Sequence, residues 1–398
     1  PGYPARGAQE SMASVVHRLF GLGAHGKEPR MKGLSVNATN FRAIKHLAFA
    51  PSGTCLLAGA NGAGKTTTLD VFRFLRALFE LGHESAFAAV EESHFRRRDA
   101  ANEEPVTIAV TVGDIEWRLQ FPMSDAGPQG AYGETLTHRG ATVLHRAIGQ
   151  TDMPLESRCC AKRLWERSES RWMAPLVLAL TEIRVYGAFS LHPVQRPAPL
   201  EPSASFLDET GKNLWSVLAN WKSAPIRHRG RFDWVVARAQ EAFPDLMGSI
   251  EIDRGLPFLF PPGAKDPAQG LPPSRAADGL LMGLLHLTAV AGAQPHSLLA
   301  FDETKSQLHP HALRSLLKAM REQAAQRDLT IIVTSHSPVV MNAFRDEPQH
   351  VFVLQPDADR TPVPLIELHD EDWLAAVSLG DLYDRLDFAA PRAPRRAE

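Results

Sequence analysis

The sequence has few cysteines and lacks a long hydrophobic run. Its 398 residues include three cysteines, Cys55, Cys159 and Cys160. An odd count with one adjacent pair does not make a disulfide framework, so a reducing compartment is favoured. No apolar run reaches the roughly 18 residues needed to cross a bilayer. These absences predict a cytoplasmic protein with no membrane partner, and they offer no spaced cysteine metal site.

A strong net charge is also absent, because 43 Lys and Arg residues nearly balance 45 Asp and Glu residues, which gives a formal charge of -2. A near-neutral total gives no field that draws the whole molecule to nucleic acid or membrane. Any such contact needs a local patch, and the densest basic runs are Arg96–Arg98 and Ile226–Arg231. We interpret both as solvated surface, with a DNA or RNA contact as the alternative.

Strands and helices alternate in the last third of the chain. Leu298–Phe301 and Leu329–Val333 have the length and apolar character of buried strands, whereas Ala277–Val290 and Ala312–Ala325 have helical spacing. This alternation predicts an α/β fold with a largely parallel core sheet. Pro364–Leu368 is predicted as a further strand.

The first half of the chain contains both kinds of pattern. Cys55–Ala58 is predicted as a buried strand that leads into a helix over residues 65–81. Val106–Val112 and Ile115–Phe121 predict an antiparallel hairpin that turns at Gly113–Asp114. The polar, glycine-rich stretch 123–150 is predicted as loop, and a mostly helical region follows it.

Residues 59–66 fit the full G-x-x-x-x-G-K-[ST] pattern of a phosphate-binding loop. The glycines permit backbone conformations that point successive N–H groups at phosphate oxygens. Lys65 would place its cation on the β- and γ-phosphates, and Thr66 offers a hydroxyl ligand to Mg²⁺. Because a predicted strand precedes the loop and a predicted helix follows it, nucleotide binding is favoured over a plain glycine-rich turn. The predicted nucleotide contacts are Gly59, Ala60, Asn61, Gly62, Ala63, Gly64, Lys65, Thr66 and Thr67.

Two carboxylates, Asp302 and Glu303, end the apolar strand at 298–301. Asp302 is predicted to hold Mg²⁺, directly or through water, as the second-strand aspartate does in other P-loop enzymes. Glu303 would orient or deprotonate the attacking water, because phosphoryl transfer depends mainly on positioning and charge stabilisation. His336 follows the next strand and is predicted as a catalytic contact to the γ-phosphate or the water. Taken alone, solvated acids and a surface histidine are the simpler interpretations.

Several motifs in order resemble the RecF-like and SMC-like branch of ABC-type ATPases, the predicted ATPases of the OLD/RecF group. Asp302 lies far along the chain from Lys65, which indicates the large insertion of that branch. The matching segments are Asn40-Phe41-Arg42, Leu69-Asp70, Gly211-Lys212-Asn213-Leu214, Ala277-Asp278-Gly279, Asp302-Glu303 with Leu308-His309-Pro310, Thr334-Ser335-His336-Ser337-Pro338, and Ser378-Leu379-Gly380-Asp381-Leu382.

The resemblance implies an ABC-type P-loop head with a parallel core sheet, an antiparallel β subdomain and a helical insertion. The implied parts are a flexible extension (1–30), a first half of the head (31–122), a mostly helical insertion (123–270), a second half (271–386) and a flexible tail (387–398). Asp357-Ala358-Asp359 resembles the D-x-D of TOPRIM nucleases, but we interpret it as a turn, which predicts a branch without that domain.

In that family, two heads close on each other with ATP at their interface, and the signature of one head covers the γ-phosphate held by the other. The resemblance therefore implies ATP as the nucleotide, self-association, and γ-phosphate contacts from Asp278 and Gly279. Three departures stand out: Ala277 replaces the signature serine, Thr304 and Lys305 replace a proline and a glutamate, and no clear Q-loop glutamine follows the first helix. Loss of one donor at a transition state costs roughly 10²-fold in rate, so slow hydrolysis is expected.

Two functional hypotheses remain open on the sequence. The first is an ATPase head that gates a DNA-linked process, repair or anti-phage defence, together with a separate effector protein. The second is an ATP-sensing scaffold that hydrolyses slowly and holds the effector. A transporter ATPase subunit fits the phosphate loop but not the insertion or the 378–382 motif.

Overall fold

The structure is a computed structural model. It describes residues 33–90, 95–97, 104–122, 132–149, 159–167, 170–187, 189–224, 226–303, 308–354 and 361–386. Contacts divide the chain into two compact units, residues 1–50 with 70–183 and residues 51–69 with 184–398, and each is described by itself. The predicted parts, with boundaries at 122 and 270, stay a prediction. The predictions for residues 1–30, 304–305, 357–359 and 387–398 lie outside the described residues.

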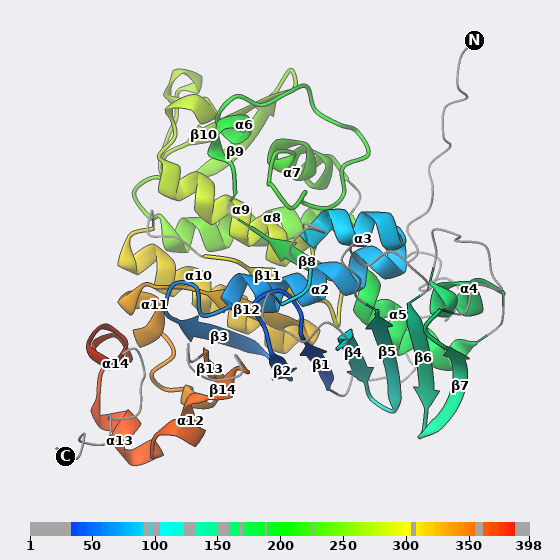
Figure 1. The fold of residues 1–398 in the computed structure, drawn as a ribbon. Helices are drawn as coiled ribbons and strands as arrows, with labels where there is room; N and C mark the ends of the chain where they lie inside the picture. The colour runs from blue at the N-terminus through cyan, green and yellow to red at the C-terminus, as the bar shows by residue number, and fades with distance from the viewer. Residues whose placement is uncertain are drawn as a thin grey trace, which may run out of the picture. The chain divides into compact units, whose positions relative to one another are not determined.

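The first unit contains a six-stranded antiparallel sheet, in the order β2-β1-β4-β5-β6-β7 (Figure 1). Its first strands alternate buried with more exposed residues, as expected for a sheet with one covered face. The predicted hairpin is confirmed, because β4 pairs with β5 around Gly113, whose φ of 61° suits glycine. The strands are β1 (Leu34–Thr39), β2 (His46–Phe49), β4 (Val106–Val112), β5 (Ile115–Phe121), β6 (Gly133–His138) and β7 (Ala141–Arg146).

The predicted loop at 123–150 is wrong for its second half, where β6 and β7 form a hairpin. β7 is the edge strand of the sheet, and all its residues are exposed or partly exposed. An edge strand with neither face covered needs no hydrophobic alternation, so the sequence lacks the period-two signal. The segment 123–270 holds the strands β6 to β10 as well as the helices α4 to α8.

The helices of the first unit cover an aromatic core and a buried carboxylate. Glu134 of β6 is fully buried, and it accepts hydrogen bonds from Trp117 Nε1 (2.9 Å), Cys160 N (2.7 Å) and Ala161 N (2.7 Å). The carboxylate thus satisfies orphan N–H groups at the start of α4. The helices are α3 (His83–Val90), α4 (Cys160–Arg167) and α5 (Ala174–Thr181), with most of α2 (Lys65–Glu80).

The second unit contains a six-stranded sheet with a parallel centre, in the order β14-β13-β3-β12-β11-β8. Strands β13, β3, β12 and β11 pair in parallel, and β14 joins the edge antiparallel. Every residue of β3 and β11 is buried, as expected where both faces are covered. The strands are β3 (Thr54–Gly59), β8 (Ile183–Tyr186), β11 (Leu298–Phe301), β12 (Thr330–Thr334), β13 (Val351–Leu354) and β14 (Val363–Pro364). The predicted α/β class with a largely parallel core sheet is confirmed.

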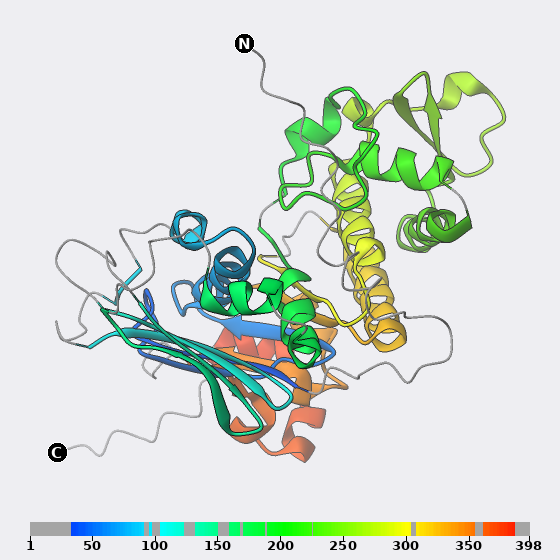
Figure 2. The same ribbon diagram turned by 90° about the vertical axis from the view of Figure 1, so that its right-hand side faces the viewer.

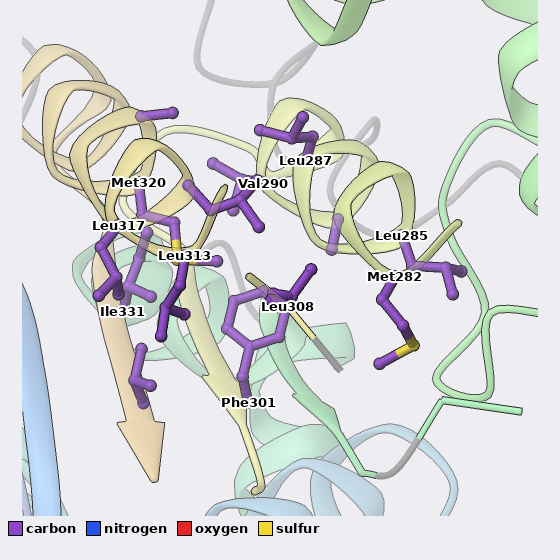
Figure 3. Packing of buried hydrophobic residues seen from close by; sticks show 14 of the residues in the cluster. Met282, Leu285, Leu287, Val290, Phe301, Leu308, Leu313, Leu317, Met320 and Ile331 are labelled. Atoms are coloured by element: carbon purple, nitrogen blue, oxygen red, sulfur yellow. The ribbon is translucent and has the colours of Figure 1, made fainter. Parts of the chain in front are cut away.

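Helices pack around this sheet, and a small hairpin accompanies them (Figures 1 and 2). Residues 280–292 of α9 are all buried, which fits a helix that is apolar on every side. Side chains from α9, α10, β11 and β12 fill one core, which Figure 3 shows around Phe301 and Val290. The remaining elements are α6 (Leu191–Gln195), α7 (Leu214–Ser223), α8 (Ile226–Ala242), β9 (Ser249–Asp253), β10 (Leu256–Phe260), α9 (Asp278–Gly292), α10 (Pro310–Arg327), α11 (Pro338–Asn342), α12 (Leu365–Leu368), α13 (Glu371–Ala376) and α14 (Leu379–Leu386).

The strand predicted at Pro364–Leu368 is wrong beyond its first residue. β14 ends at Pro364, and Leu365–Leu368 forms helix α12. Leu365 and Leu368 are three residues apart, which puts them on one face of a helix. Five residues are too few for periodicity to separate helix from strand.

Gly211 gives a stability prediction. Its φ is 78°, and a Cβ there would press into Leu285 of α9 and lie 3.0 Å from Phe189 Cδ1. Gly211→Ala should therefore lower the free energy of unfolding by about 2–4 kcal/mol, through backbone strain and overpacking. Urea unfolding of the full chain measures this.

The matched control is Gly230→Ala in α8, where a Cβ meets nothing within 4 Å. That change should be neutral or stabilise by up to about 1 kcal/mol, because alanine favours helix. Equal stability of the two variants would show that the turn at Gly211 tolerates a side chain.

Candidate nucleotide site

Three parallel strands end at one edge of the second unit's sheet. β12 pairs with β3 so that Val333 faces Leu56, and β11 pairs with β12 so that Phe301 faces Val333. Since parallel strands share the direction of their carboxyl ends, the residues after each strand gather there. The edge therefore brings together the phosphate loop after β3, Asp302 and Glu303 after β11, and His336 after β12.

The loop after β3 depends on glycine where it leaves the strand. Gly59 has a φ of 153°, and a Cβ there would lie 2.7 Å from the carbonyl oxygen of Leu354 in β13. Gly64 has a φ of 107° at the start of α2, a conformation that side chains disfavour. Ala63 N donates to Ala60 O at 3.1 Å, which closes a tight turn. The backbone is thus shaped for close approach to a ligand, as the motif requires.

Lys65 is buried at the centre of this loop, with 6% of its surface exposed. Its Nζ donates to Gly59 O at 2.7 Å and to Ala60 O at 3.0 Å. Burial lowers the pKa of Lys65 from its ordinary value, while the charges of Glu303 and Asp302 oppose this shift. The acidic pair therefore lies within electrostatic reach of the lysine, although the two groups are far apart in the sequence.

The other loop residues differ in exposure. Asn61, Gly62 and Thr66 are exposed, and Ala60 and Thr67 are partly exposed. Ala63 and Gly64 are buried and support the turn. A glycine-shaped loop with an exposed hydroxyl and a buried lysine fits a nucleotide phosphate, and the hydroxyl with the nearby carboxylate fits Mg²⁺.

A threonine joins the two acidic residues. Thr334, the last residue of β12, donates its hydroxyl to Asp302 Oδ1 at 2.9 Å and accepts from Glu303 N at 2.7 Å. Asp302 N donates to Tyr186 O at 2.8 Å. Glu303 has a φ of 50°, which costs a residue with a side chain about 1–2 kcal/mol. These bonds hold the Asp302 carboxylate and the Glu303 backbone at the strand end, a contact that the motif containing Thr334 did not predict.

His336 contacts a residue from the C-terminal part of the chain. Its Nδ1 lies 2.7 Å from the hydroxyl of Tyr383 in α14, and that hydroxyl donates to Gly59 O at 3.4 Å. The histidine is thereby linked to the phosphate loop. Tyr383 was not among the predicted site residues, although it directly follows the 378–382 motif.

Asp278 and Gly279 begin helix α9, and the hydrogen bond of Asp278 is with α6 and not with the phosphate loop. Asp278 Oδ1 accepts from Gln195 Nε2 at 2.8 Å, and Asp278 is exposed. Ala277 is the N-cap of α9 and provides no side-chain hydrogen bond to the first turn. The structure thus brings the loop, the acidic pair and the histidine together, whereas the signature-like helix start is an exposed terminus.

The second basic run belongs to α8. Arg229 pairs with Asp233 at 3.1 Å, and Arg231 lies over the ring of Trp221 at 5.7 Å. These local contacts agree with a solvated, paired helix face. No helix among the described residues combines the length and apolar character that a membrane span needs.

A family model matches residues 56–342, which include the loop, the acidic pair and the histidine. Its description is "AAA domain, putative AbiEii toxin, Type IV TA system". The chain belongs to this AAA family. The predicted P-loop ATPase class is confirmed at this level, and the fold is one that supports ATP binding. No curated protein matches the chain.

Solved structures with a similar fold include SMC heads and an ABC transporter subunit. One is an SMC head bound to the C-winged helix domain of ScpA, which is 14% identical to this chain. The match covers 84% of this chain and 97% of the SMC head, with a TM-score of 0.48. An SMC head with an extended coiled coil, bound to ScpA from Pyrococcus furiosus, is 11% identical, with 82% and 94% covered and a TM-score of 0.49. An ATP-binding subunit of an ABC transporter is 13% identical, with 88% and 98% covered and a TM-score of 0.37.

Lys65→Ala should weaken ATP binding while the fold persists. The change removes a cation that would form charge-assisted hydrogen bonds, each worth about 1.5–3 kcal/mol, or roughly a 10- to 100-fold loss of affinity. Calorimetric titration with ATP measures it. Lys318→Ala on the exposed face of α10 is the control, because that side chain is 71% exposed. Equal affinities in all three proteins would reject the site.

Proposed function

We propose that this chain is an ATPase head that binds ATP and Mg²⁺, pairs with a second copy around the nucleotide, and gates a DNA-linked process through a separate effector. The observation that supports this most is the convergence of Lys65, Asp302, Glu303 and His336 at one sheet edge. Solvated acids and a surface histidine would not lie around one buried lysine, whereas here the charges of Asp302 and Glu303 act on Lys65, and both Lys65 and Tyr383, the partner of His336, bond to Gly59 O.

Each residue has a proposed task that follows from its chemistry. Lys65 and the loop amides bind phosphate oxygens, and Thr66 and Asp302 are the groups suited to hold Mg²⁺. The metal, when bound, would neutralise charge on the phosphate oxygens. Glu303 orients the attacking water and accepts its proton, while Thr334 fixes the backbone beneath it. His336 contacts the water or the terminal phosphate.

Self-association is proposed through the start of α9. Its N-terminus is exposed, ends in Asp278 and Gly279, and has no side-chain cap. A 15-residue helix with bare N–H groups favours an anion at that end. The proposed ligand is the nucleotide held by the second copy. ATP can shift the balance between open and paired states only through its different affinity for the two.

A separate effector is proposed because the described residues contain no group of three or more His, Cys, Asp or Glu side chains that could hold a metal. The family description names a toxin of a toxin–antitoxin system, which supports defence over repair as the process. The cytoplasm is the proposed location, since all three cysteines are buried free thiols. DNA remains a proposed ligand or trigger.

A slow ATP sensor that holds the effector is the second candidate. The observation in its favour is Ala277, which has no hydroxyl to offer a γ-phosphate at the helix start.

Glu303→Gln should keep ATP affinity within about threefold and slow hydrolysis by roughly 10²- to 10³-fold, because shape is retained and the base is lost. With Mg-ATP, the variant should accumulate as a pair detectable by light scattering. Glu322→Gln on α10 is the control. Turnover is measured with and without DNA, and stimulation by DNA favours the gating function over the sensor.

The same variant also tests the effector. Proteins that co-purify from the native host with Glu303→Gln in Mg-ATP, and are released without nucleotide, would support a separate partner. ATP-dependent nucleic-acid cleavage by the purified chain alone would contradict it.

Ala277→Ser distinguishes the two candidates. The added hydroxyl should raise hydrolysis by roughly 10-fold or more if a missing donor limits the rate. It should also stabilise the fold by about 1 kcal/mol as an N-cap, which reports independently that the side chain reaches the helix start. Ala268→Ser, on an exposed surface turn, is the control. A faster variant would support the sensor, because Ala277 would then be what slows the wild type, whereas a more stable variant with an unchanged rate would remove the observation in the sensor's favour.

A further inference from the structure

A chain of hydrogen bonds runs from the phosphate loop to the histidine through a tyrosine. Gly59 O is 3.4 Å from Tyr383 Oη, and Tyr383 Oη is 2.7 Å from His336 Nδ1. Tyr383 is 8% exposed, so water does not readily compete for these bonds. The three residues come from β3, the end of β12 and α14, which are far apart in the sequence.

The direction of each proton in this chain follows from what the groups can do. A backbone carbonyl can only accept, and Gly59 O accepts from Lys65 Nζ at 2.7 Å as well as from the tyrosine hydroxyl at 3.4 Å. With the single hydroxyl proton of Tyr383 in the bond to Gly59 O, the tyrosine oxygen is the acceptor of the 2.7 Å contact with the histidine. His336 then donates from Nδ1, and the neutral ring carries its lone pair on Nε2.

We propose that Tyr383 is a positioning residue that selects the Nδ1–H tautomer of His336 and fixes the ring relative to the phosphate loop. This inference rests on the proposed function only for the use of the tautomer. A histidine that accepts a proton from water, or contacts a phosphate, needs a fixed protonation state at Nε2. The physical content of the inference, the tautomer, does not depend on hydrolysis.

The fold holds Tyr383 in place for this role. Asn342 Oδ1, at the end of α11, accepts from Ser378 Oγ and from Gly380 N, both at 2.9 Å. A Cβ on Gly380 would lie 2.9 Å from the carbonyl oxygen of Pro338, so glycine is required for this approach. Helix α11 begins two residues after His336, and its last residue binds the start of α14, which carries Tyr383. The same short helix therefore positions both partners of the 2.7 Å bond.

These contacts indicate what the 378–382 motif does in the fold. Ser378 and Gly380 dock α14 on α11, and the next residue past the motif reaches the histidine. The last described helix of the chain is part of the site's geometry, although it lies outside the family match at 56–342.

The test is histidine nitrogen NMR on the full, nucleotide-free chain with ¹⁵N-labelled histidine. His336→Gln identifies the His336 signals. We expect wild type to show Nδ1–H with an unprotonated Nε2, and Tyr383→Phe to move the ring toward the Nε2–H form. Tyr132→Phe, a buried tyrosine of the other unit, should leave the His336 signals unchanged.

A second readout is the rate of ATP hydrolysis. Loss of the hydrogen-bond partner that orients a metal-binding histidine costs about 10- to 100-fold. By analogy, Tyr383→Phe should lower kcat by about that factor with KM within about twofold. An Nε2–H ring in wild type, or no tautomer change in Tyr383→Phe, would overturn the proposal. A wild type without ATPase activity would instead remove the proposed function, and the tautomer result would still decide this inference.

Discussion

Parallel pairing of β3, β12 and β11 is the interaction on which the site depends. The register fixes Thr334 opposite Leu57 and Phe301 opposite Val333, so the strand ends meet at the same level. A slip of one residue would turn every side chain to the other face of the sheet. Thr334 could then no longer bond to Asp302 and Glu303, and the carboxylates would lose their fixed positions beside Lys65.

Aromatic packing around Phe301 supports this arrangement of strands. Phe301, the last residue of β11, stacks on Tyr186 with ring centroids 5.3 Å apart, and His286 of α9 lies 5.1 Å away. Burial lowers the pKa of His286 to about 4, so this ring is neutral at physiological pH and packs as an aromatic. The helix that begins with the signature-like residues is thus seated directly on the strand that presents the acidic pair.

That the residues of the candidate site lie at one sheet edge could be predicted from the sequence, because each belongs to a local motif next to a buried strand, while their roles stay predictions. The phosphate loop, Asp302 and His336 each follow an apolar run, and an apolar run is the strongest strand signal for a parallel sheet. Thr334 and Tyr383 escaped prediction because their roles depend on partners far along the chain. Thr334 begins a motif, but its bond to Asp302 joins two strands that are separate in the sequence, and Tyr383 acquires its contact only when α14 docks on α11.

The misassigned elements share a different cause. β7 lies at a sheet edge and buries nothing, so alternation was not required of Ala141–Arg146. Leu365–Leu368 buries only Leu365, which leaves too few apolar positions to define a period. Hydrophobic periodicity arises because one face of a helix or strand is buried. An element that buries few side chains therefore has little hydrophobic periodicity in its sequence.

The backbone conformation of Glu303 disfavours the carboxylate side chain that its proposed role requires. A φ of 50° is most easily adopted by glycine or asparagine, whereas water activation requires a carboxylate. Under the proposed function, selection for turnover would keep a glutamate in that conformation. If a descendant of this chain lost the need to hydrolyse, drift at this one position toward asparagine or glycine would relieve the strain. The residue found there would record whether such a lineage still uses the energy of ATP or only its presence.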